Sequence, residues 1–104
     1  MKIRVRKGGY SADVVRNYVD LTQPIQSLSS RFDEVVKFVD GKPTNEVVAY
    51  KAWFTQEGVG PFQVKFTKKA KLPKYLSIVE FDNLEACEVN YNVYFRAVNV
   101  KEIR

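Results

Sequence analysis

Residues 87–100 alternate apolar with polar side chains over an unusually long run. In an extended chain, one side of this run would carry Cys87, Val89, Tyr91, Val93, Phe95 and Ala97, and the other Glu88, Asn90, Asn92, Tyr94 and Arg96. A period of two residues is that of a half-buried β-strand, because successive side chains of a strand point to opposite faces. A helix would scatter both sets around its circumference. The pattern predicts a long strand here.

Other segments have the pattern or the composition of strands. Residues 62–68 alternate in the same way, and residues 46–56 are rich in valine and aromatic side chains. Residues 2–6 and 77–81 are shorter runs of the same character. Most of the chain is therefore expected to be extended.

Turn-forming residues separate these strands. Glycine, proline, asparagine and aspartate gather at residues 40–45, which predicts a hairpin with a longer loop before the strand at 46–56. Residues 58–61 predict a second turn, and residues 70–75 a loop or a single helical turn. Five or six strands between such turns are typical of small sandwiches and barrels.

Two N-terminal segments, residues 13–21 and 31–39, fit a helical as well as an extended pattern. We expect strands in both, which leaves room for one short helix. The sequence thus predicts an all-β fold in a single domain of residues 1–104. At this length, the leading candidate is a small antiparallel Greek-key barrel of the oligonucleotide-binding (OB) type.

The composition excludes most catalytic chemistry. The chain of 104 residues is 45% apolar, so it can bury a core without a metal or a disulfide. It has no histidine and one cysteine, Cys87, which excludes Ser-His and Cys-His catalysis, zinc cages and iron–sulfur sites. We expect a cytoplasmic, non-enzymatic protein with no cofactor, no metal site and no membrane span, with Cys87 in its core. A nuclease using the carboxylates of Glu80 and Asp82 is the weakest alternative.

The positive charge is unevenly distributed. The formal net charge is +5, and residues 58–79 contain five lysines and no acid. The first seven residues contain four further basic residues, whereas four acids gather in residues 80–88. A segregated basic region is typical of a protein that binds a polyanion. The alternative interpretation is a solvated, lysine-rich loop.

Alternation also assigns side chains to faces. If the strands at 46–56, 62–69 and 88–96 are neighbours, one surface would carry rings interleaved with cations, as single-stranded nucleic acid requires. The candidate nucleic-acid-binding residues are Lys51, Trp53, Lys65, Lys68, Lys69, Lys71, Tyr94 and Arg96. As alternatives, Trp53 would belong to the core, Tyr94 would be an ordinary half-exposed strand residue, and Arg96 would pair with Glu80 or Glu88.

Residues from about 40 onward resemble two groups of proteins. The turn Gly41-Lys42-Pro43-Thr44-Asn45-Glu46, the strand after it and the segment 94–103 are similar to short proteins of Gram-positive integrative conjugative elements, some of which are helicase processivity factors. The same region resembles the small single-stranded-DNA-binding proteins of phages, which are OB-like and often dimeric. The resemblance implies single-stranded DNA as a partner, in the replication or transfer of a phage or mobile element.

The first functional hypothesis is therefore a sequence-tolerant single-stranded-DNA-binding protein, with RNA as a second ligand of the same kind. In it the lysines and Arg96 would contact phosphate, and Trp53 and Tyr94 would stack on bases. A homodimer and a replication helicase as partner are compatible with this hypothesis. The alternative is an adaptor of a phage or mobile element that binds an acidic protein or a helicase through the same basic surface.

Overall fold

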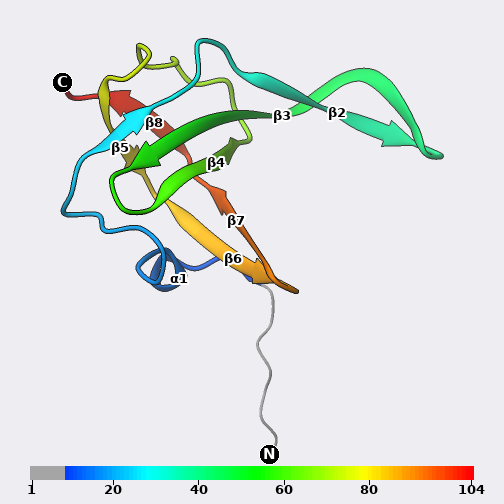
Figure 1. Cartoon of the computed structure of the whole chain (residues 1–104). Helices are drawn as coiled ribbons and strands as arrows, with labels where there is room; N and C mark the ends of the chain where they lie inside the picture. The colour runs from blue at the N-terminus through cyan, green and yellow to red at the C-terminus, as the bar shows by residue number, and fades with distance from the viewer. Residues whose placement is uncertain (1–8) are drawn as a thin grey trace, which may run out of the picture.

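The computed structural model describes residues 9–104 and is mostly β (Figure 1). Its one short helix and eight strands are α1 (Ala12–Val15), β1 (Ile25–Ser27), β2 (Asp33–Val39), β3 (Lys42–Gln56), β4 (Gly60–Phe66), β5 (Ile78–Asp82), β6 (Glu85–Val89), β7 (Asn92–Arg96) and β8 (Asn99–Glu102). The expectation of a β-rich chain with room for one short helix is confirmed.

The strands form one open, mixed sheet. Its order is β6-β7-β4-β3-β1-β5-β8, and β2 pairs with the outer part of β3. β4 and β7 run parallel, while the other paired strands are antiparallel. The predicted closed antiparallel barrel is therefore wrong, and the OB-like Greek key is not confirmed. The parallel pair needs the long connection through β5 and β6, which local sequence patterns do not reveal.

The alternating run of residues 87–100 contains a turn. β6 and β7 form a hairpin through Asn90 and Tyr91, and Asn90 has a left-handed φ of 59°. A two-residue turn leaves the alternation intact while the chain reverses. Cys87 pairs with Tyr94, so odd-numbered residues of β6 share a face with even-numbered residues of β7. The prediction of one long strand is wrong, and so is the placing of Cys87 on the same face as Phe95, although Cys87 is buried as expected.

β2 and the outer part of β3 form an arm, residues 36–48, that projects from the rest of the sheet (Figure 1). Asp40 and Gly41 make the tight turn, with φ values of 51° and 79°. Two left-handed residues suit the twist of a two-residue hairpin. The strand expected over residues 31–39 is confirmed, whereas the longer loop expected over residues 40–45 is wrong because β3 already begins at Lys42.

The N-terminal part departs from the expected strand at residues 13–21. The side chain of Ser11 accepts a hydrogen bond of 3.0 Å from the N–H of Asp13, which caps α1. Serine is favoured at this position because it satisfies a backbone donor that the first helical turn leaves free. The chain then turns at residues 16–18 instead of extending. The strand expected at residues 2–6 lies outside the described residues.

The core is built around aromatic side chains from β3, β4, β5 and β7. Phe54 is fully buried, and its ring centroid lies 4.8 Å from that of Phe81, 6.3 Å from that of Phe62 and 6.5 Å from that of Phe66. Phe62 also packs on Phe95 at 5.0 Å. The even-numbered residues of β4 and of β3 from Tyr50 to Gln56 thus face the core, as their alternation predicts, and the odd-numbered residues of the same segments point to the opposite, outer face.

Candidate nucleic-acid interface

Three strands bring basic side chains from distant parts of the sequence into one row. Lys51 of β3 pairs with Lys65 of β4, and Lys65 pairs with Arg96 of β7. Paired residues of neighbouring strands project from the same face, with Cβ atoms about 4.5–5.5 Å apart in an antiparallel pair. Lys51, Lys65 and Arg96 therefore form a cation row across the outer face of the sheet.

The pairing of like charges in this row lowers the stability of the folded sheet. Like charges directly opposite each other destabilise a sheet, and Lys51 lies directly opposite Lys65. Among residues 9–104, neither lysine has a carboxylate within 4.0 Å. Departures from the rules of stable folding gather at functional sites. Arg96 is paired with Glu85, so the cost lies at the Lys51–Lys65 pair, where a bound anion would relieve it.

Arg96 is held in place by two neighbours. Its Nε donates a hydrogen bond of 2.9 Å to the carboxylate of Glu85, and its guanidinium carbon lies 4.0 Å from the centroid of the Tyr10 ring. Arg96 thus pairs with Glu85, its cross-strand neighbour, rather than with Glu80 or Glu88 as weighed above. The two terminal nitrogens form no hydrogen bond with residues 9–104, so they can donate to a ligand.

Trp53 and Tyr94 lie on the same outer face and form a ring row beside the cation row. Trp53 follows Lys51 by two residues in β3, and Tyr94 precedes Arg96 by two residues in β7. Along each of these strands, the ring is therefore about 7 Å from the cation. Trp53 is 41% exposed and Tyr94 48% exposed, so neither ring belongs to the core. Two hydrogen bonds fix the backbone of Trp53. Its N–H donates to the side-chain oxygen of Ser29 at 2.7 Å, and its carbonyl accepts from the N–H of Leu28 at 2.9 Å.

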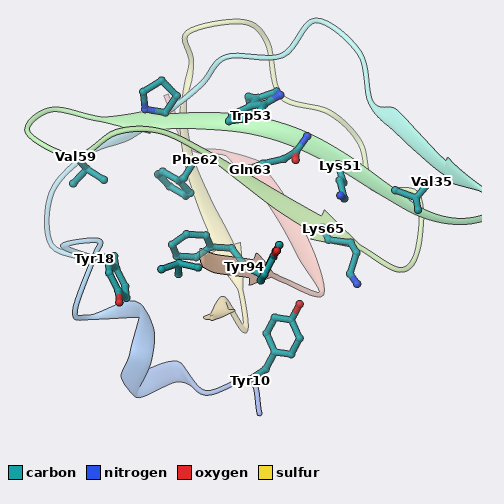
Figure 2. Close-up of a pocket in the computed structure, with 13 residues that line it drawn as sticks. Tyr10, Tyr18, Val35, Lys51, Trp53, Val59, Phe62, Gln63, Lys65 and Tyr94 are labelled. Atoms are coloured by element: carbon teal, nitrogen blue, oxygen red, sulfur yellow. The ribbon is translucent and has the colours of Figure 1, made fainter. Parts of the chain in front are cut away.

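A groove of about 620 Å³ runs along these residues (Figure 2). β4 and β7 pair only at Val64–Phe95 and Lys65–Arg96, and the groove is lined by the residues of both strands that precede this pairing. The groove is lined by Lys51, Trp53, Lys65 and Tyr94 on the sheet, and by Tyr10 and Tyr18 on the opposite wall. Its size is that of an ordinary ligand site.

Tyr10 and Tyr18 were not identified from the sequence. They flank α1, which is attached to β6 by backbone hydrogen bonds of 2.9 and 3.0 Å between Ser11 and Ala86. The hydroxyl of Tyr18 donates to the carboxylate of Glu88. The only sequence signal is a pair of tyrosines around a short helical segment, and nothing in that segment shows which strand it contacts.

The two tyrosines add no negative charge to the groove. Burial raises the pKa of Tyr10 above its ordinary value, and the nearby Cys87 thiol adds to the rise. The hydrogen bond to Glu88 raises the pKa of Tyr18, because it favours the neutral phenol. Both side chains are therefore neutral at physiological pH and present a ring to a ligand without repelling a phosphate.

The remaining candidate lysines lie elsewhere. Lys68 is exposed in the bend that follows β4. Lys69 lines a separate hollow with Phe32 and Tyr50, and Lys71 lines another with Lys74, next to β8. The structure thus brings together five of the eight candidates and separates Lys68, Lys69 and Lys71 from them.

The described residues offer little to a metal ion. Glu80 pairs in register with Lys101, whose Nζ lies 4.0 Å from the carboxylate of Asp82. Within residues 9–104 there is no group of three or more side chains of the kind that ligates metals. In the same part of the chain, no helix has the length and apolar character needed to cross a bilayer.

Comparison with protein-family models, with curated proteins and with solved structures finds no match for this chain.

Proposed function

We propose that the protein binds single-stranded DNA, with little sequence preference, on the outer face of β3, β4 and β7. The observation that carries the proposal is the cation row lying beside the ring row on one half-exposed, grooved surface. Cations attract the phosphates of a single strand, and exposed rings stack on its bases. β3 and β7 each supply one cation and one ring, whereas β4 supplies the cation Lys65 and, opposite Trp53, the polar side chain of Gln63.

The proposed contacts are to phosphates and to base faces, which every nucleotide has. Binding would therefore tolerate any sequence, and RNA would bind through the same contacts. A role in phage or mobile-element replication or transfer in the cytoplasm, together with a helicase or as a homodimer, is part of the proposal. This part is supported by the resemblance of residues 40–54 and 94–103, and not by the geometry of the sheet.

The proposal distinguishes two pairs of lysines. Lys51→Gln with Lys65→Gln is expected to weaken binding to oligo-dT about 20-fold at about 0.1 M salt, and to reduce the salt slope by about 1.4. Each lysine lost removes one phosphate contact and the counterion that it releases. Fluorescence anisotropy of labelled oligo-dT at several salt concentrations measures both quantities.

The matched control is Lys71→Gln with Lys74→Gln, which removes the same charge from the hollow beside β8. Its affinity is expected to stay within about twofold of the unmodified protein, apart from a small effect of net charge. Equal losses in the two double variants, or a larger loss in the control, would show that the strand does not lie on the outer face.

The second candidate function is binding to an acidic protein partner through the same cations. Exposed tryptophan and tyrosine side chains beside arginine are also typical of protein–protein interfaces, so the affinity for oligo-dT distinguishes the two functions. Recovery of one acidic partner after nuclease treatment, combined with no affinity for oligo-dT, would favour the protein partner instead.

A further inference from the structure

The cation row ends in an acid on both sides. Asp33 of β2 pairs in register with Lys51, and Glu85 of β6 pairs with Arg96. Across five neighbouring strands, the same face thus carries an acid, three cations and an acid. Asp33 is exposed and Glu85 is half-buried beside Arg96, so both carboxylates adjoin the surface on which a ligand would lie.

The arrangement also sets the direction of a bound strand. Along any one β-strand, the outer face of β3, β4 or β7 offers a single cation to a phosphate backbone. Across the strands it offers three. Trp53 and Tyr94 lie about 7 Å further along β3 and β7, beside the groove that opens between β4 and β7. A backbone that meets all three cations, with its bases directed at the rings, must cross the β-strands.

The length of this path is short. Neighbouring strands lie about 4.8 Å apart, so the cation row spans about 10 Å from β3 to β7. That distance accommodates about three phosphates, one for each cation. A fourth phosphate at either end would come close to the carboxylate of Asp33 or Glu85, and like charges repel.

We propose, building on the proposed function, that a single strand crosses β3, β4 and β7 with a footprint of three to four nucleotides, and that Asp33 and Glu85 set its two ends. The strand does not continue to Lys68, Lys69 or Lys71. The protein would then hold a short segment of nucleic acid rather than wrap a long one.

The test is a series of unlabelled oligo-dT of about 4, 8 and 20 nucleotides, titrated at several salt concentrations with Trp53 emission as the readout. With about 0.7 released counterions per phosphate, three contacts give a slope of log K against log salt of about −2 at every length. A longer oligonucleotide offers more overlapping positions for a footprint of three to four nucleotides. The association constant divided by the number of these positions should be nearly the same for all lengths. A slope near −4 that appears only with the longest oligonucleotide would overturn the short footprint, because it needs about six phosphate contacts.

Removing the negative charges of Asp33 and Glu85 tests whether these two acids limit the length of the bound segment. In Glu85→Gln the side-chain amide oxygen can still accept the hydrogen bond from the Nε of Arg96, so the position of Arg96 is kept. Asp33→Asn with Glu85→Gln is expected to raise the affinity for the oligonucleotide of about 8 nucleotides roughly threefold to tenfold, and that for the shortest one much less. Glu46→Gln with Glu80→Gln makes the same change of charge away from the outer face, and is expected to change both affinities by less than about twofold. An equal rise in both double variants would overturn the assignment of the two ends.

The two proposals fail in different ways. If no oligonucleotide binds at low salt, the proposed function is wrong and the footprint falls with it. If long oligonucleotides bind tightly with the steeper slope, the function stands and only the footprint is wrong.

Discussion

Replacing Trp53 and Tyr94 together with alanine is expected to weaken binding to single-stranded DNA by at least about 30-fold. Stacking of a base on an aromatic side chain is worth about 1–3 kcal/mol, so the loss of two rings removes about 2–6 kcal/mol. Both rings are half-exposed before binding, and each would be covered by a base in the complex. Anisotropy with labelled oligo-dT at constant salt measures the loss, and the salt slope should not change because no cation is removed.

The matched control removes two exposed rings that do not line the groove. Tyr75 and Tyr91 are more exposed than Trp53, and both lie in turns. Their joint replacement with alanine is expected to leave the affinity within about twofold, since exposed side chains away from the site contribute little. If both double variants lose affinity equally, the rings of the outer face have no special role.

Replacing Phe54 with alanine is expected to lower the free energy of unfolding by about 3–5 kcal/mol, the cost of emptying a large aromatic site in a core. Phe54 is fully buried and packs edge-on against Phe81 and Phe66, so it joins β3 to β5 as well as to β4. In a domain of this size, such a loss lowers the melting temperature by about 12 °C or more. Urea titration followed by circular dichroism measures the change directly.

Phe38 provides the control for this prediction. Phe38 lies in the arm, where its side chain is 62% exposed, so the same replacement of phenylalanine with alanine can be made outside the core. Phe38→Ala is expected to cost less than about 0.5 kcal/mol. A cost for Phe54→Ala no larger than that for Phe38→Ala would mean that the aromatic cluster is not the core of this fold.

The sequence revealed the faces of individual strands well. Alternation in β3 and β4 placed Lys51, Trp53 and Lys65 opposite the core, and the spacing of Tyr94 and Arg96 placed them on one face of β7. This worked because the period of two is a local property of the extended backbone. The same period hid the turn at Asn90, since a two-residue turn preserves the alternation.

The neighbours of each strand could not be predicted in the same way. The parallel pairing of β4 with β7 depends on the path of the chain between them, and it decides that Lys65 lies next to Arg96 rather than next to Lys69. The density of lysines in residues 65–74 indicated a single basic cluster, yet the chain bends after β4 and separates them. Tyr10 reaches the groove only because the segment before α1 pairs with β6.

The most direct test of the outer face as a nucleic-acid interface is the emission of Trp53 during a titration of the unmodified protein with oligo-dT of about 20 nucleotides, repeated at rising salt. Trp53 is the only tryptophan, so the signal comes from the ring row alone. We expect quenching that saturates with the strand and weakens as salt rises. Absence of binding at low salt, or saturable binding with unchanged Trp53 emission, would contradict the assignment of this face.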